Sequence, residues 1–185
     1  MCGELMWYVV QVAVGSENKV RDMITRAAEV HEAATSTKVL DECFVPKYQA
    51  QQKFRGEYRF VERNLLPGYV IVVTNNVHEL NEVLYRIIPF TKILGNHAGF
   101  APLSRAEMAF LNSMTTEQHR LVDMSHAVKE GDSITVIDGP LVGREGWIKS
   151  INRRKGTCRI ETTLFGRTIN VEIGLAVLAK SEQTA

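Results

Sequence analysis

Alternating apolar and polar segments predict that strands and helices follow one another through the first third of the chain. Residues 5–12 form an apolar run rich in aromatic and β-branched side chains, which is typical of a buried strand. After Gly15 and Ser16, apolar residues recur at helical spacing to about Glu32 and predict an amphipathic helix. A second strand is expected over residues 39–49.

The next segments continue this alternation. Two polar, alternating stretches on either side of Arg55 and Gly56 predict a protruding hairpin, and residues 66–73 predict another central strand. Amphipathic helices are expected over 78–88 and 104–114, the second beginning with an S-x-x-E capping box. This order favours an α+β domain, a sheet with helices packed on it, over about 110 residues.

The last third of the chain predicts a different architecture. After a polar stretch without clear periodicity, four short alternating segments separated by turns suit a small β-barrel of about five strands. We therefore predict a four-part organisation, with a first domain, a flexible linker, a barrel domain and a tail: 1–112, 113–126, 127–180 and 181–185.

Charge is concentrated in the predicted barrel, although the 185-residue chain has a formal net charge of only +1. Residues 127–180 carry nine Lys or Arg against six Asp or Glu, whereas residues 1–126 carry 13 against 14. From Arg144 to Arg159 there are six cations and one anion, Glu145. Such a local cluster is suited to holding a polyanion.

Motifs for catalysis or cofactor binding do not occur in the sequence. There is no Gly-rich phosphate loop, HExxH or GxSxG motif, the five histidines lack ligand spacing, and the three cysteines are far apart. We therefore expect no enzyme activity, cofactor or metal site, and free thiols. Without an apolar run of membrane-spanning length or a signal peptide, we expect a cytoplasmic protein that does not bind membranes.

Two segments carry a resemblance to a known family. The stretch GDSITVIDGPLVGREGWIKSI followed by LFGRTINVEI resembles a KOW domain, a small Src-homology-3-like barrel. WYVVQV with SENKV, and later LLPGYVIV, resemble the amino-terminal NGN domain of the NusG family, which has a ferredoxin- or RNP-like fold. The resemblance covers nearly the whole chain in the family's order. It implies a monomeric transcription elongation factor.

The resemblance also implies where RNA polymerase binds. In the family, the amino-terminal domain docks an apolar patch on the clamp helices of the polymerase, beside the upstream DNA. The matching positions here are Leu66, Pro67, Gly68, Tyr69 and Ile71. The alternative is that Pro67 and Gly68 only form a turn and that Tyr69 and Ile71 are core residues.

The hairpin leaves two interpretations open. Its cations are suited to a contact with upstream DNA, and they are Lys47, Lys53, Arg55, Arg59 and Arg63. Glu57 and Glu62 interrupt them, which favours a solvated face that prevents edge-to-edge pairing.

Two departures from housekeeping members suggest a specialised paralogue. Leu141 and Arg144 stand where aromatic residues are common on the surface that engages Rho or a ribosomal protein; Phe165 is retained. The turn NRRKG is more basic than usual, which resembles antiterminators of the LoaP type that bind a hairpin in a nascent leader transcript. The predicted RNA-binding residues are Arg144, Trp147, Lys149, Asn152, Arg153, Arg154, Lys155 and Arg159. For these residues, the alternative is a solvated turn with Trp147 in the core. For the function, the alternatives are a housekeeping NusG and a ribosome-associated KOW protein.

Overall fold

The computed structural model describes residues 5–87, 91–116 and 118–178. By its internal contacts the chain separates into two compact units, each made of two segments. The first unit contains Met1–Pro46 and Leu66–Met108, and the second contains Lys47–Leu65 and Ala109–Ala185. Within the described ranges, no helix is both long and apolar enough to cross a membrane.

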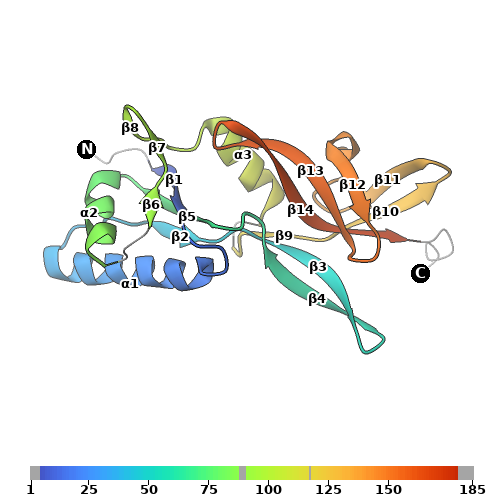
Figure 1. Cartoon of the computed structure of the whole chain (residues 1–185), viewed down its shortest axis with the longest axis horizontal. Helices are drawn as coiled ribbons and strands as arrows, with labels where there is room; N and C mark the ends of the chain where they lie inside the picture. Colours follow the sequence, from blue (N-terminus) through green and yellow to red (C-terminus); the bar gives the residue numbers. More distant parts are fainter. Residues whose placement is uncertain (1–4, 88–90, 117, 179–185) are drawn as a thin grey trace. The chain divides into compact units, whose positions relative to one another are not determined.

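The first unit is built on a four-stranded antiparallel sheet in the order β2-β5-β1-β6. Its strands are β1 (Met6–Gln11), β2 (Glu42–Phe44), β5 (Tyr69–Thr74) and β6 (Lys92–Ile93). Helices α1 (Glu17–Thr35) and α2 (Val77–Ile87) lie side by side on one face of this sheet (Figure 1). The predicted α+β domain, with helices packed on a sheet, is therefore confirmed.

One face of this sheet forms the core beneath the two helices. Val10 of β1 pairs with Val70 of β5, and both side chains are fully buried. Ile24 of α1 and Leu80 of α2 are also fully buried and belong to the same apolar cluster. The helical periodicity seen in the sequence thus marks the side of each helix that faces the sheet.

The first unit ends with short strands and the start of a helix. A two-stranded ribbon joins β7 (Gly95–Asn96) to β8 (Gly99–Phe100), and α3 (Arg105–Met114) follows. The capping box is present: the backbone N–H of Glu107 donates to Ser104 Oγ at 3.3 Å, and the backbone N–H of Ser104 donates to Glu107 Oε2 at 2.7 Å. These reciprocal bonds pair backbone donors that have no partner inside a helix.

The predicted hairpin lies in the second unit and is formed by β3 (Lys47–Phe54) and β4 (Glu57–Asn64). Its two-residue turn has left-handed backbone at both positions, with φ of 51° at Arg55 and 91° at Gly56. This turn matches the twist of the flanking strands. A third strand, β9 (Leu121–Val122), pairs in parallel with β3.

The rest of the second unit contains a five-stranded sheet in the order β11-β10-β14-β13-β12. Its strands are β10 (Ser125–Glu130), β11 (Ser133–Asp138), β12 (Ile148–Asn152), β13 (Thr157–Leu164) and β14 (Arg167–Leu178). The number of strands agrees with the prediction, but β11 and β12 do not pair among the described residues, so the barrel is not closed by hydrogen bonds. The chain between these two strands instead forms turns and the short 3-10 helix η1 (Glu145–Trp147).

The segment predicted as a linker, residues 113–126, differs from the expectation of irregular structure. It contains β9 and the beginning of β10, and Val122, Met124 and Ser125 are buried. Polar neighbours hide these short apolar positions in the sequence, and pairing with β3 gives them a place in a sheet. The mobility of this segment and the four predicted boundaries stay predictions.

Candidate nucleic-acid interface

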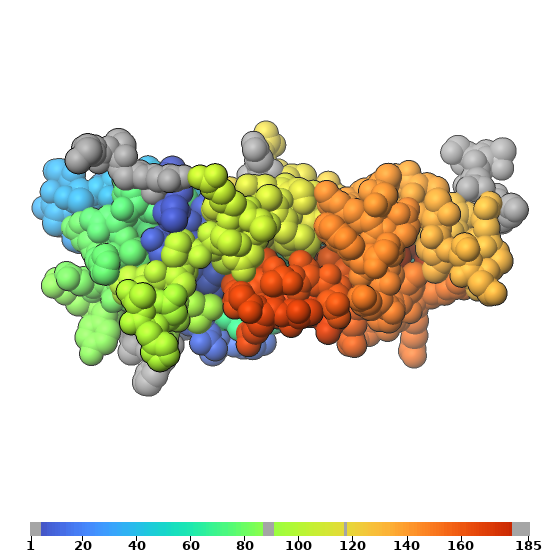
Figure 2. Space-filling model, turned by 90° about the horizontal axis from the view of Figure 1, so that it is seen from above, coloured from blue at the N-terminus to red at the C-terminus, as the bar shows by residue number. Residues whose placement is uncertain are grey.

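Strands β12, β13 and β14 and the turn after β12 line an open hollow with a volume of about 560 Å³. We call it the β12–β14 hollow. The orange and red atoms of these strands form a continuous surface in Figure 2. Half of the predicted RNA-binding residues line the hollow: Asn152, Arg153, Lys155 and Arg159. Segments that are separate in the sequence therefore bring cations to one concave surface.

Local hydrogen bonds shape the turn that carries Arg153, Arg154 and Lys155, of which Arg153 and Lys155 line the hollow. The backbone N–H of Lys155 donates to Asn152 Oδ1 at 3.1 Å, and Gly156 takes a left-handed conformation with φ of 61°. Asn152 therefore contributes to turn formation. Because the backbone is held in this way, the side chains of Arg153, Arg154 and Lys155 are exposed.

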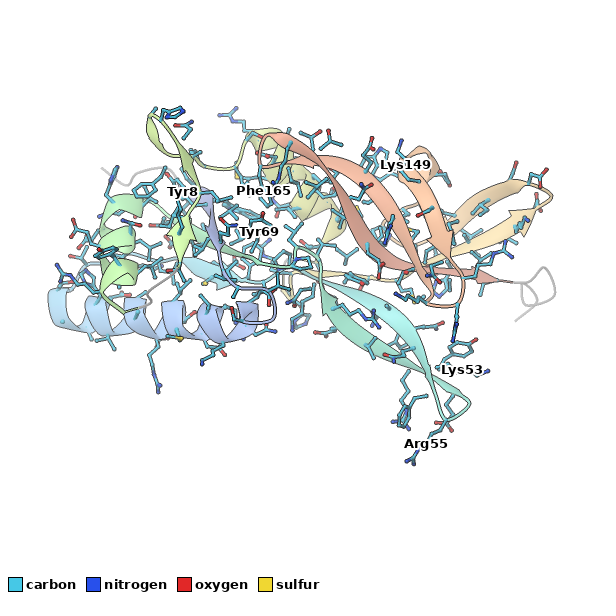
Figure 3. The ribbon with its side chains drawn as sticks, viewed as in Figure 1. Tyr8, Lys53, Arg55, Tyr69, Lys149 and Phe165 are labelled. Atoms are coloured by element: carbon cyan, nitrogen blue, oxygen red, sulfur yellow. The ribbon has the colours of Figure 1, made fainter. Side chains whose placement is uncertain are left out.

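The charges on this turn are not neutralised by neighbouring side chains. Within the described ranges, no ion pair involves the turn cations Arg153, Arg154 and Lys155 or the strand residue Arg159. By contrast, Lys149 Nζ lies 3.8 Å from Glu161 Oε1. Figure 3 labels Lys149 on β12. The turn and Arg159 thus keep their charge for an anionic ligand, whereas the charge of Lys149 is partly balanced.

One anion, Glu172, also lines the hollow. It pairs with Arg159 in the register of β13 and β14. The Tyr48 hydroxyl donates a hydrogen bond to Glu172 Oε1 at 2.9 Å. Burial, followed by this hydrogen bond, raises the pKa of the Tyr48 phenol to about 12. The hydrogen bond joins the first strand of the hairpin to the last strand of the sheet.

Arg144 and Trp147 form a different cluster and do not line the hollow. The half-buried Arg144 donates from Nη1 to the Pro140 carbonyl at 3.1 Å, and its guanidinium lies over the Trp147 ring at 5.0 Å. The Phe110 ring of α3 lies 5.9 Å from Trp147. Trp147 is 37% exposed, which excludes the alternative that it belongs to the core.

The predicted polymerase-binding residues differ in accessibility. Leu66 and Ile71 are buried, at 3% and 0% exposure, whereas Pro67 is exposed and Tyr69 is half-buried. Burial of Ile71 follows from its position in a central strand that is covered on both faces. Pro67 and Tyr69 are thus the members of this set that a partner can touch in this conformation.

A buried carboxylate shapes the turn between Pro67 and Tyr69. Glu17 is 1% exposed, and it accepts hydrogen bonds from the backbone N–H groups of Gly68 at 2.7 Å and Gly15 at 2.8 Å. Gly68 has a left-handed φ of 85°, and a Cβ there would lie 3.3 Å from Val14 Cγ2. These contacts hold the start of β5 against the start of α1.

The predicted second-partner surface needs a correction at Leu141. This side chain is fully buried, because the turn at Gly139 directs the chain inward and the Leu141 N–H donates to Ser125 Oγ at 3.2 Å. The next residue, Val142, is 51% exposed. Phe165 is half-buried and has a left-handed φ of 58°.

The hairpin carries exposed aromatic residues that the sequence analysis missed. Phe54, Tyr58 and Phe60 are 49%, 67% and 59% exposed. Cations lie over two of these rings, at 5.7 Å for Lys53 on Tyr58 and at 5.3 and 5.4 Å for Arg55 and Arg59 on Phe54. Figure 3 places Lys53 and Arg55 at the far end of the hairpin. The sequence did contain a signal for this surface, because three aromatic residues occur in a hairpin that is expected to be exposed to solvent.

The structure also bears on metal and thiol chemistry. Among the residues it describes, no group of three His, Cys, Asp or Glu side chains is arranged to hold a metal ion. Cys43 and Cys158 are free, and burial raises the pKa of each thiol to about 12, which disfavours the reactive thiolate. Cys2 lies outside the described residues.

Comparison with known proteins places this architecture in a family. The family model described as transcription termination factor nusG matches residues 5–112, which is more than half of the chain. The chain belongs to the NusG family. A KOW motif matches residues 130–161, in the five-stranded sheet. The first match includes the helix-covered sheet and the β3–β4 hairpin of this NusG-family protein.

Relatives of the NusG family match over most of their length. The transcription termination/antitermination protein NusG of Rickettsia prowazekii is 22% identical over 95% of this chain and 90% of its own. The protein of the same name from Lactococcus lactis is 28% identical, and the match covers 91% of this chain and 89% of the relative. A solved structure described as domain interaction in Thermotoga maritima NusG has a TM-score of 0.53 at 19% identity. The match covers 92% of this chain and 94% of that chain. This likeness supports the fold.

Proposed function

We propose that this NusG-family protein is a specialised transcription antitermination factor of the LoaP type. Its first domain binds the clamp helices of RNA polymerase, and its C-terminal sheet binds an RNA hairpin in a nascent leader transcript. The observation that carries the proposal is the set of unpaired cations around the β12–β14 hollow. Unpaired Arg and Lys side chains on a concave surface bind phosphates strongly, and Arg can also contact guanine edges.

The shape of RNA limits which part of the hairpin is recognised. The major groove of a regular A-form helix is too narrow for side chains to enter. The target is therefore a loop, bulge or helix end, where unpaired nucleotides reach the β12–β14 hollow. Cations from the turn and from β13 line the same hollow. A turn that is merely solvated has no need of this arrangement, so it supports RNA binding over that alternative.

The hairpin of β3 and β4 is a second proposed contact, with upstream DNA. Its exposed aromatic rings and their stacked cations support this proposal over a purely solvated face. Aromatic rings stack on bases, and cations beside them attract the phosphates. Upstream DNA provides both groups where its strands are separated next to the polymerase.

The test of the proposed function compares two double variants. RNA crosslinked to the full-length protein in cells identifies the target, which is then compared in vitro with a scrambled hairpin at physiological salt. Arg153→Ala with Arg159→Ala should weaken target binding about 30-fold, at about 1 kcal/mol for each lost contact, and abolish antitermination. Polymerase binding should be unchanged. Arg86→Ala with Lys129→Ala removes two exposed cations outside the hollow and is the matched control.

A housekeeping NusG that links polymerase to Rho or a ribosomal protein is the second candidate. The end-to-end match with termination/antitermination proteins favours it. It predicts that the full-length chain binds Rho or a ribosomal protein and does not discriminate the target from the scrambled hairpin. A ribosome-associated KOW protein would bind RNA without binding polymerase. Measurements of polymerase binding, of Rho or ribosomal-protein binding and of RNA discrimination therefore separate the three functions.

A further inference from the structure

The β12–β14 hollow contains one polar group that phosphate binding alone does not explain. It is the Glu172 carboxylate on β14. A carboxylate repels phosphates, so a surface that only attracts a nucleic-acid backbone gains nothing from Glu172. Glu172 accepts a hydrogen bond from Tyr48, and its remaining acceptor capacity beside the cations suits a ligand that also donates hydrogen bonds.

Glu172 is held in place from one side and keeps the capacity to accept further hydrogen bonds. The buried Tyr48 hydroxyl donates to Oε1, and in the described part of the chain no hydrogen bond to Oε2 is formed. A carboxylate has about four lone-pair sites. Both oxygens of Glu172 can therefore accept from a ligand without breaking the bond to Tyr48.

Thr157, at the start of β13, also lines the hollow, but its hydroxyl is enclosed by protein atoms. It is 1% exposed, and the hydroxyl has no hydrogen-bond partner in the residues that the structure describes. A ligand in the hollow does not reach this hydroxyl in the present conformation, so the groups available to a ligand are Glu172 and the cations.

These groups fit a single nucleotide. A volume of about 560 Å³ falls within the range of ordinary small-ligand sites, roughly 300–1,000 Å³. Arg153, Lys155 and Arg159 match its phosphates, and Glu172 matches a base edge with hydrogen-bond donors. Guanine offers two adjacent donors, N1–H and the N2 amine, to a carboxylate, whereas cytosine and adenine each offer one amine.

We propose that the β12–β14 hollow binds one unpaired guanosine of the RNA, with the guanine edge on Glu172 and the flanking phosphates on the three cations. The guanosine is unpaired because base pairing occupies the same donors. This proposal rests on the proposed function, since it specifies which nucleotide the RNA presents. It gives Glu172 a binding role in addition to its hydrogen bond with Tyr48.

The experiment uses the full-length protein and four RNA hairpins. All have the same stem and a loop of seven uridines whose central nucleotide is replaced by guanosine, cytidine or adenosine, or kept as uridine. Fluorescence anisotropy at physiological salt should show that the guanosine hairpin binds at least about fivefold more tightly than the other three, the lower bound for a bidentate base contact. Inosine, which lacks the N2 amine, should bind with intermediate affinity.

A pair of variants assigns the preference to Glu172. Glu172→Gln should bind the guanosine and cytidine hairpins with similar affinity, because the amide replaces one acceptor oxygen by a donor. Glu161→Gln removes the same charge from the neighbouring strand outside the hollow and should keep the guanosine preference. A guanosine preference that survives Glu172→Gln would overturn the proposal.

The outcomes also separate this proposal from the proposed function. If all four hairpins bind with equal affinity, RNA binding stands and the guanosine site is overturned. If none of the hairpins binds, the guanosine site is overturned, whereas the proposed function fails only if the crosslinked target is also not bound more tightly than its scrambled control. Equal changes in the affinity of the guanosine hairpin in Glu172→Gln and Glu161→Gln would show a general charge effect, which also overturns the site.

Discussion

Tyr69 is the half-buried aromatic residue of the predicted polymerase-binding set, at the first position of β5. We expect Tyr69→Ala to weaken binding to core RNA polymerase by more than about 2 kcal/mol, or about 30-fold, because aromatic anchors dominate such interfaces. The measurement is the affinity of the full-length protein for polymerase immobilised on a surface. Tyr85→Ala removes an 86% exposed tyrosine from α2 and should leave the affinity unchanged. Equal affinities of both variants would exclude the assigned patch.

The hydrogen bond from Tyr48 to Glu172 makes stability depend on pH. Because the folded pKa of Tyr48 is about 12, above the ordinary value of 10.0, its stabilising contribution is complete below pH 10 and is lost as the pH rises towards 12. Tyr48→Phe should lower the free energy of unfolding by about 1–3 kcal/mol at pH 7. Urea titrations should show this difference shrinking above pH 10. A difference that stays constant to pH 12 would contradict the assignment.

At the scale of elements, the hairpin combines a stable turn with an exposed aromatic end. Replacing Phe54, Tyr58 and Phe60 by Ser should weaken binding to single-stranded DNA by at least about 1 kcal/mol for each stacked base, with little change in melting temperature. Electrophoretic mobility shift and thermal denaturation provide the two measurements. Ile137→Ser with Val142→Ser removes exposed apolar side chains elsewhere and is the control. Unchanged DNA binding by the triple variant would support the solvated hairpin.

Strands β3 and β14 approach closely at Gly174. A Cβ at this position would overlap the backbone carbonyl oxygen of Gln49, so no flexible side chain can move away to make room. We expect Gly174→Ala to destabilise the protein by about 1–3 kcal/mol, as overpacking commonly does. Gly146→Ala introduces the same methyl group where no atom lies within 4 Å and is the matched control. Urea unfolding that does not distinguish the two variants would show that β3 and β14 do not pack in solution.

At the scale of the whole molecule, the sequence predicts two domains joined by a flexible linker at 113–126. Gln118 and His119 are exposed, whereas Val122 and Met124 are buried. We therefore expect a nonspecific protease to cut first near Gln118 and His119 and to leave two resistant fragments. Mass spectrometry of the early products provides the measurement. First cleavage elsewhere, or a chain that resists cleavage, would contradict the two-domain prediction.

Local sequence signals were sufficient for most elements of this NusG-family protein. The helical spacing of Val20, Ile24 and Ala28, the capping box of α3 and the Arg55-Gly56 turn each depend on neighbouring residues, and each is present in the structure. Alternation along β13 likewise predicts that Cys158, Ile160, Thr162 and Leu164 point inside. Cys158, Ile160 and Leu164 are buried, whereas Thr162 is half-buried. Short-range periodicity and turn residues set local preferences for helix, strand or turn, and tertiary packing in this protein agrees with those preferences.

Long-range packing sets which of the predicted site residues are accessible and which of them meet. Leu141 and Ile71 are buried and Trp147 is exposed, because burial depends on what covers a strand or turn and not on the residue's type. The hollow needs strand pairing to bring Glu172, Thr157 and the basic turn together. Local patterns in the sequence were enough to predict the strands, the helices and the concentration of cations. The long-range strand register, which no local pattern contains, places those cations around the carboxylate that Tyr48 anchors.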